Sequence, residues 1–141
     1  MANGVPDWQR IAVAGHSQGA GMAAFLAKRT PVARVALLSG PLDFVWPSHG
    51  PAPSLAAPSA TPGERWYGLY HGEERQAALL RQAYGALGLA PDQIRVLRLA
   101  PDGWAPDAFH KSVVVDPLTP RAADGSPAYA ADWAFLLGGG H

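Results

Sequence analysis

The sequence has no cysteine, which excludes a disulfide framework, a thiolate metal site and a cysteine nucleophile. It also lacks an excess of charge of either sign, because eleven Lys and Arg residues balance eleven Asp and Glu residues. Proteins that bind nucleic acid or an anionic membrane surface depend on surplus Lys and Arg. We therefore expect neither nucleic acid nor a membrane as a partner.

Long hydrophobic runs are absent as well. No segment approaches the roughly eighteen continuous apolar residues that a membrane helix needs, and residues 1–8 do not show the charged and then apolar pattern of an export signal. The chain as given is therefore expected to be cytoplasmic. Its 141 residues suit one buried core, so we expect a single domain over residues 1–141.

Apolar runs of strand length alternate along the chain with stretches of helical spacing. This alternation predicts the α/β class, with about four mostly parallel strands and flanking helices. The last strand contains two arginines and is expected near a sheet edge. Strands are predicted at 10–14, 32–39, 65–71 and 93–99, and helices at 19–28, 73–87 and 127–137. Ser126 is the expected N-cap of the last helix, and Gly138 is its expected stop.

Glycine and proline, by contrast, are abundant, with 16 and 14 residues. The segment 40–63 contains six of the prolines and shows no periodic pattern. Long irregular segments in compact domains are usually functional lids or disordered stretches, and we interpret this one as a lid over a site. Residues 138–141 are predicted to form a flexible tail.

One motif carries chemistry. It follows the first predicted strand, opens the first predicted helix and reads Gly15-His16-Ser17-Gln18-Gly19. A serine on such a sharp turn has a strained backbone, so the residues two positions to either side should be small where strand and helix approach. The turn exposes the Ser17 hydroxyl, and the N–H of Gln18 becomes a donor for a developing oxyanion.

A Gly-x-Ser-x-Gly sequence can also arise by chance in a chain this rich in glycine, as a purely structural turn. The position of this one, between an apolar strand and a run of helix formers, favours the nucleophile interpretation. A serine hydroxyl needs a base to take its proton and a carboxylate to orient that base. Carboxylates and histidines follow Ser17 along the chain.

The segment 11–24 resembles the α/β-hydrolase superfamily, in particular its bacterial serine esterases and lipases. In that superfamily the acid and the histidine lie on loops after later strands. Here the third strand ends in His71-Gly72-Glu73-Glu74, which is similar to the turn that carries the acid, and the segment 110–117 is similar to the region around the histidine. The resemblance implies Ser17 as nucleophile, His110 as base and Glu74 as acid.

Other residues remain open for the acid. Glu73 is the neighbour of Glu74, and Asp43 follows the second strand, where some lipases of the superfamily place their acid. His71 is expected to brace the acid turn. The histidines do not share the spacing that metal ligation requires, so we expect neither a metal nor a cofactor.

The resemblance covers only the carboxyl half of the superfamily's fold, because the family sheet normally has several strands before the nucleophile strand. The chain is thus expected to be a minimal, truncated α/β-hydrolase-like domain. The loop that usually supplies the second oxyanion N–H is missing. The strand at 10–14 would be an unpaired apolar edge, which natural proteins rarely expose, so we predict a homo-oligomer that covers this edge.

These observations predict a carboxylesterase-like serine hydrolase that cleaves small carboxylic esters through an acyl-enzyme. Small residues near the elbow favour short acyl chains, and Trp46, Trp66 and Trp104 are candidate pocket walls. Fold alone does not fix the substrate. The alternative is a catalytically silent half-fold or binding module that retains the nucleophile elbow.

Overall fold

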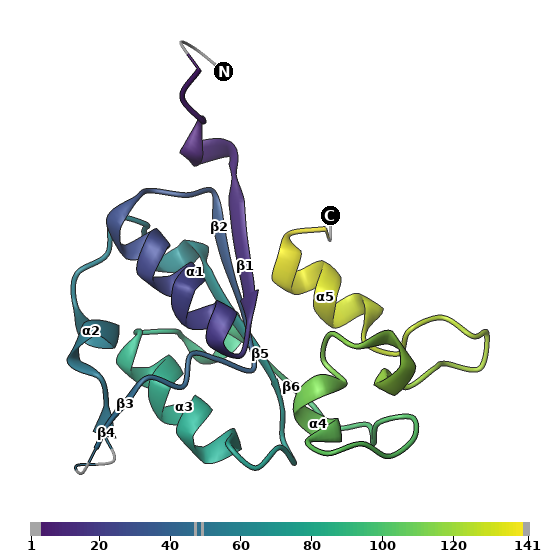
Figure 1. Ribbon diagram of the computed structural model, residues 1–141. Helices are drawn as coiled ribbons and strands as arrows, with labels where there is room; N and C mark the ends of the chain where they lie inside the picture. Colours follow the sequence, from purple (N-terminus) through teal and green to yellow (C-terminus); the bar gives the residue numbers. More distant parts are fainter. Residues whose placement is uncertain (1–3, 47, 49, 140–141) are drawn as a thin grey trace.

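Four parallel strands form the main sheet of the computed structural model, which describes residues 4–46, 48 and 50–139 (Figure 1). In spatial order they are β1 (Ala12–His16), β2 (Arg34–Leu38), β5 (Trp66–His71) and β6 (Ile94–Leu97). Every neighbouring pair in this sheet is parallel. The predicted α/β class with four parallel strands is therefore confirmed, as is the edge position of the strand with two arginines.

The first strand begins and ends later than predicted. Residues 8–10 form a short 3-10 helix, and β1 then extends through Gly15 to His16. As a result, the strand delivers the chain directly to Ser17. The remaining strands lie within their predicted ranges, at 34–38, 66–71 and 94–97.

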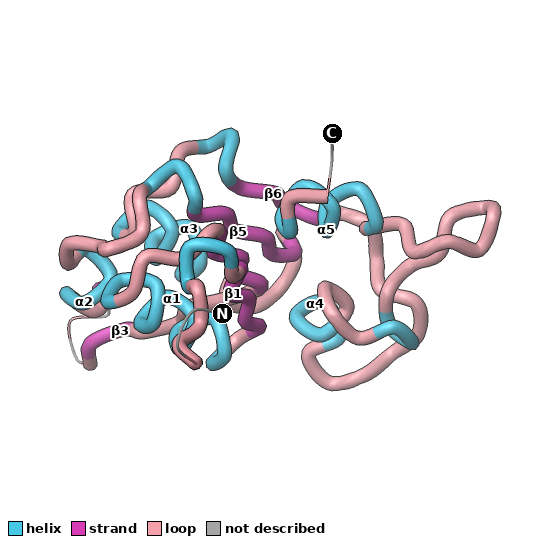
Figure 2. The backbone as a smooth tube through the Cα atoms, turned by 90° about the horizontal axis from the view of Figure 1, so that it is seen from above, coloured by secondary structure: helices cyan, strands magenta, loops and turns pink. Residues whose placement is uncertain are grey.

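Helices cover both faces of the sheet. On one face lie α1 (Gln18–Arg29) and α3 (Ala77–Ala86), and on the other lies α5 (Ala130–Leu137), so the strands are sandwiched between them (Figure 2). Four alanines of α1 are buried in the core on its side of the sheet. Their small side chains let the helix axis approach the strands closely, which is how α1 can begin immediately after the elbow.

The second face is covered less completely. A smaller core joins β2 and β5 to α5 through residues such as Leu38, Leu69 and Leu136. Ala12 and Ala14 of β1 stay exposed. The outer strand thus has one open edge and one partly open face.

Two helices begin several residues later than the sequence predicts. The helix expected from residue 73 begins at Ala77, because residues 73–76 form a turn closed by the N–H of Ala77 donating to the carbonyl of Glu74. The last helix begins at Ala130, and Ser126 is not its N-cap, because the Ser126 hydroxyl donates to Asp124 at 2.6 Å. Ser126 therefore belongs to a short polar turn before the helix, because its side chain bonds within that turn and does not cap α5.

Gly138 does end α5, in the left-handed conformation at φ 84°. The predicted flexible tail falls partly on residues 140 and 141, which lie outside the described residues. The described residues contain four 3-10 helices, at Trp8–Arg10, Gly63–Arg65, Pro91–Gln93 and Asp116–Leu118. In the described ranges, every helix is too short or too polar to cross a bilayer.

The Pro-rich segment 40–63 contains short elements where the sequence indicated only a loop. They are β3 (Phe44–Val45), β4 (Gly50–Pro51), which pairs with it in antiparallel fashion, and α2 (Pro53–Ala56). The end of the segment is bonded to α1, since the N–H of Thr61 donates to the carbonyl of Ala27. The segment runs along α1, and a lid role for it stays a prediction.

Candidate functional site

Ser17 occupies the sharp turn between β1 and α1. Its backbone angles are φ 56° and ψ −119°, a conformation that L-residues rarely adopt and that is typically maintained only by the surrounding structure. The Ser17 N–H donates to the carbonyl of Leu38 at 2.9 Å, which fixes the turn to β2. Within the described residues, the Ser17 hydroxyl makes no hydrogen bond.

The two glycines of the motif differ in what they do. A Cβ on Gly15 would collide with the backbone of Gly19 and Ala20, so this position cannot carry a side chain without moving α1. A Cβ on Gly19 would meet nothing within 4 Å. The expectation that both glycines are sterically required is therefore correct for Gly15 and wrong for Gly19, because the close approach takes place on one side of the turn only.

Gly40 is a second glycine in close contact at the elbow, and it lies outside the motif. A Cβ there would collide with the carbonyl of Ser17 and the side chain of Ala20. Gly40 follows β2 in sequence, and only the pairing of β2 with β1 brings it to the elbow. A glycine directly after an apolar strand was the only sequence signal for it.

Glu74 and His110 form a close pair. The Nδ1 atom of His110 lies 2.6 Å from Oε2 of Glu74, and the Glu74 side chain is fully buried. His110 lies on α4 (Ala108–Lys111), a single helical turn rather than the loop expected from the sequence. Because a carboxylate oxygen accepts, Nδ1 of His110 is the donor of this bond, and the tautomer protonated at Nδ1 alone has Nε2 as an acceptor.

The other oxygen of Glu74 is also engaged. Oε1 accepts hydrogen bonds from the Ser39 hydroxyl at 2.9 Å and from the His71 N–H at 3.0 Å. Ser39 is fully buried and has a left-handed backbone at φ 45°. The sequence reasoning missed Ser39, and its only signal was its place at the carboxyl end of a predicted strand.

The two alternative acids lie elsewhere. Glu73 is exposed, and only its backbone takes part in the turn. Asp43 is exposed too, and its carboxylate lies beside Gly21 on α1, where a Cβ would be 3.0 Å from Oδ2. Among the described residues, His110 is the partner of neither carboxylate.

His71 holds the acid turn in place. It is fully buried, its Nε2 donates to the carbonyl of Leu99 at 2.8 Å, and its Nδ1 accepts the N–H of Glu73 at 3.0 Å. Both nitrogens of a neutral ring are thereby used. The ring also packs at 4.7 Å between centroids against Phe109, the residue before His110.

His16 also contacts His110. Its Nε2 lies 2.9 Å from the carbonyl oxygen of His110, and the two rings are 4.6 Å apart between centroids. Burial lowers the pKa of His16 below its usual value, because desolvation disfavours the charged ring. The sequence indicated His16 only as a member of the elbow.

Gln18 is the first residue of α1 and is exposed. The N–H groups in the first turn of a helix have no carbonyl partner within the helix, and the positive end of the helix dipole lies there. The N–H of Gln18 is thus available beside Ser17 for a negatively charged oxygen. It has the position that the motif predicts for an oxyanion donor.

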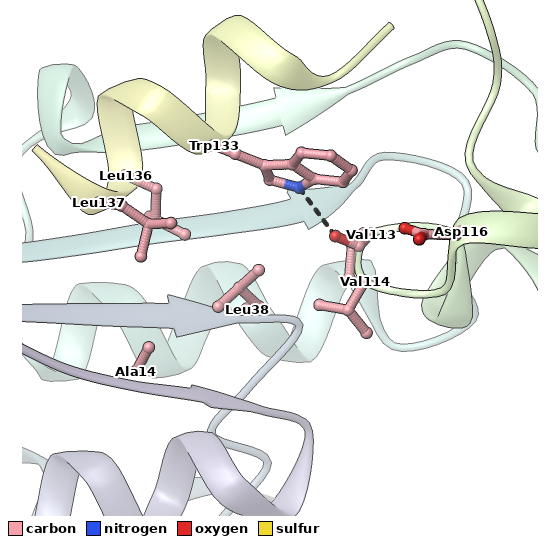
Figure 3. A pocket seen from close by; sticks show the side chains of 8 residues that line it. All are labelled: Ala14, Leu38, Val113, Val114, Asp116, Trp133, Leu136 and Leu137. Carbon is pink, nitrogen blue, oxygen red and sulfur yellow. Dashed lines mark hydrogen bonds between the residues drawn. The ribbon is translucent and has the colours of Figure 1, made fainter. Parts of the chain in front are cut away.

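Two cavities of about 330 Å³ lie near this part of the molecule. One has Glu74, His110 and the exposed Trp104 in its wall. The other is apolar and lies between β1, β2, α5 and the chain after α4 (Figure 3). Its lining residues are Ala14, Leu38, Val113, Val114, Asp116, Trp133, Leu136 and Leu137.

The three tryptophans considered as pocket walls have different positions. Trp104 lines the cavity at His110, and Trp46 is exposed. Trp66 is 3% exposed and starts β5, so it lies at the opposite end of that strand from His71. Trp66 belongs to the core packed against α1 and α3, which corrects its assignment to a pocket wall near the elbow.

Over the described ranges, no group of three or more His, Asp or Glu side chains is placed to hold a metal ion. The polar side chains buried there all have hydrogen-bond partners, so none is left pointing at a vacant ligand position. Comparison with known proteins gave no match to a protein-family model, to a curated protein or to a solved structure.

Proposed function

We propose that this chain is a serine hydrolase that cleaves small carboxylic esters, with Ser17 as nucleophile, His110 as base and Glu74 as acid. The observation that carries the proposal is the 2.6 Å bond between Glu74 and His110. It joins a buried carboxylate to a histidine that contacts the elbow residue His16. Nothing in an ordinary α/β domain requires a fully buried glutamate at the end of a strand.

The hydrogen bonds of Glu74 suit His110 to act as a base. Glu74 accepts three hydrogen bonds, from Ser39, His71 and His110, so it is held in one orientation as an acceptor. It fixes the His110 tautomer with Nε2 unprotonated, and it stabilises the imidazolium that forms when Nε2 takes a proton. This is the role of the acid in a Ser-His-acid triad.

The reaction then proceeds in two halves. Ser17 Oγ attacks the ester carbonyl while its proton passes to Nε2 of His110, and the Gln18 N–H stabilises the oxyanion. The bond to the leaving alcohol breaks, and His110 gives that alcohol the proton. Water then gives a proton to His110 while its oxygen attacks the acyl carbon. The bond to Ser17 Oγ breaks, His110 returns the proton to Oγ, and the carboxylic acid is released. Contacts between nucleophile and base often tighten only with substrate bound.

The sequence resemblance to the α/β-hydrolase superfamily supports the same proposal, with the chain as a minimal form that corresponds to the carboxyl half of that fold. After Gln18, the first turn of α1 beside Ser17 contains only small residues, at positions 19–21. A small surface around the nucleophile suits short acyl chains. We therefore propose short-chain esters as the preferred substrates.

A second candidate is a catalytically silent binding module that keeps the elbow. The observation that favours it is that the Ser17 hydroxyl makes no hydrogen bond within the described residues. The Gln18 N–H is also the only oxyanion donor that the motif supplies. Loss of one such donor typically lowers the rate by about a hundred- to a thousandfold.

The test uses the full chain, a chromogenic short-chain ester and a serine-directed fluorophosphonate. Ser17→Ala should abolish labelling and lower turnover by at least about a thousandfold, whereas Ser48→Ala, at an exposed serine, should leave both unchanged. Turnover and labelling that survive Ser17→Ala would contradict the assignment of the nucleophile. Neither activity in the parent protein would support the silent module.

Two substitutions in the same turn test which residue is the acid. Glu74→Gln should lower kcat by about a thousand- to ten-thousandfold, because an amide can hold His110 in the wrong tautomer. Glu73→Gln, at the exposed neighbour, should have less than a twofold effect. Equal effects of the two substitutions on kcat would remove Glu74 from the mechanism.

A further inference from the structure

The helical turn that carries His110 has little stability of its own. α4 contains four residues, Ala108–Lys111, and its N-cap Asp107 has a left-handed backbone at φ 56° without a side-chain cap bond. Isolated helices this short do not form in water, because nucleation costs more than a single turn returns. The position of the His110 backbone must therefore be set by tertiary contacts.

His16 supplies such a contact to His110 itself. Its Nε2 is 2.9 Å from the carbonyl oxygen of His110. A carbonyl only accepts, so Nε2 of His16 carries the proton and donates. The two rings also pack against each other at 4.6 Å. His16 ends β1 and directly precedes Ser17, so it is attached to the rigid sheet.

We propose that His16 is a positioning residue that holds the backbone of His110 against the elbow, an inference that rests on the proposed function. Glu74 fixes the His110 ring through Nδ1, and His16 fixes the main chain of the same residue. The strand that delivers the nucleophile thereby also sets the place of the base. Ser17 and His110 keep their relative positions although they are 93 residues apart in sequence.

The charge of His16 matters for this role. The ionisable groups that act on it are His110 and Glu74, and burial is the main cause of its lowered pKa. At neutral pH the ring is therefore uncharged. A neutral donor holds the carbonyl of His110 without adding a positive charge beside the imidazolium that His110 becomes during the reaction.

Three substitutions test the contact. His16→Gln places an amide N–H at about the reach of Nε2 and carries no charge, so it should keep kcat within about threefold. His16→Asn is shorter and His16→Ala has no donor, so both should lower kcat by about ten- to a hundredfold with little change in KM, as expected when a catalytic group is misplaced. Met22→Ala, at an exposed position of α1, is the control.

A second readout does not need activity. In proton NMR of the full, unmodified chain, the Nδ1–H of His110 bonded to Glu74 should give a low-field resonance in the parent and in His16→Gln. It should be lost to solvent exchange in His16→Asn and His16→Ala at unchanged melting temperature. Comparing Asn with Gln decides the point even where the alanine variant folds poorly.

The outcomes separate the two proposals. A parent without ester turnover or labelling overturns the proposed function, and the NMR series then decides on positioning alone. A His16→Asn or His16→Ala protein that keeps the resonance and the kcat of the parent would overturn the role of His16. Equal losses in His16→Gln and His16→Ala would overturn it as well, because the hydrogen bond would then not be the cause.

Discussion

Gly15 leaves no room for a side chain where β1 meets α1, and the elbow depends on this absence. Its missing Cβ lets the backbone of Gly19 and Ala20 approach the strand. Ser17 then takes its strained left-handed φ, and Ser39 beside it takes another. Strain at two neighbouring serines, one the proposed nucleophile and one bonded to Glu74, is typical of a functional site.

Paired substitutions at the two motif glycines test this difference. Gly15→Ala should lower the free energy of unfolding by about 3 kcal/mol, since the added methyl overlaps backbone atoms that cannot move independently. Gly19→Ala meets open space in the first turn of α1, so it should be neutral or stabilise by up to about 1 kcal/mol. Chemical denaturation measures both values, and equal destabilisation would contradict the geometry.

At the scale of elements, one buried side chain of α3 forms hydrogen bonds to the sheet. The Tyr84 hydroxyl donates to the carbonyls of Leu37 at 3.0 Å and Leu69 at 3.2 Å, on neighbouring strands. Its ring lies over Gly68, where a Cβ would overlap the aromatic carbons. The tyrosine and the glycine together allow α3 to pack onto β5, the strand that leads to Glu74.

Tyr84→Phe should therefore cost about 1 kcal/mol of unfolding free energy, the usual net worth of a buried hydrogen bond. The Leu69 carbonyl keeps the N–H of Ser39 as a donor, so it is not left unpaired. Tyr67→Phe is the matched control, because the Tyr67 hydroxyl has no hydrogen bond within the described residues, and it should change stability by less than about 0.5 kcal/mol. Denaturant unfolding of the two variants measures this. A negligible effect of Tyr84→Phe would contradict the role of its hydroxyl.

The Tyr84 hydroxyl also makes the free energy of unfolding depend on pH in the alkaline range. Burial raises the pKa of Tyr84, so the unfolded chain releases the phenolic proton first, at about pH 10. The free energy of unfolding should accordingly fall as pH rises above about 10, and Tyr84→Phe should make this fall shallower. Part of the fall should remain, because burial also raises the pKa of Tyr129.

At the scale of the whole molecule, β1 is one of the two edge strands of the four-stranded sheet. Across the described residues it pairs with β2 alone. Ala12 and Ala14 are exposed on it, and the apolar cavity of Figure 3 opens beside Ala14. An edge strand with small side chains and no charge is a template for pairing with another chain.

We propose that a second copy of the chain covers this edge. Light scattering coupled to size exclusion should show a dimer or larger homo-oligomer. Ala12→Lys should shift the population toward monomer, since an edge lysine opposes pairing, whereas Ala78→Lys at an exposed site of α3 should not. A monodisperse monomer across the micromolar range would contradict the proposal.

The sequence by itself determined the four parallel strands and the sites of α1 and Gly15, because periodicity, small residues and the elbow spelling are local signals. Its resemblance to the α/β-hydrolase superfamily also indicated Glu74 and His110 as separate candidates. The sequence misplaced Ser126 as a cap and Trp66 as a pocket wall, since a nearby aspartate and the sheet register decide those positions.

Only the tertiary structure brought Glu74 within 2.6 Å of His110 and left Glu73 and Asp43 away from it. The contacts of Ser39, Gly40 and His16 with this pair and with the elbow likewise come from segments far apart in sequence. The physical reason is that parallel strands align their carboxyl ends at one edge of the sheet. Which side chains meet there depends on strand order and register, and no local pattern encodes either.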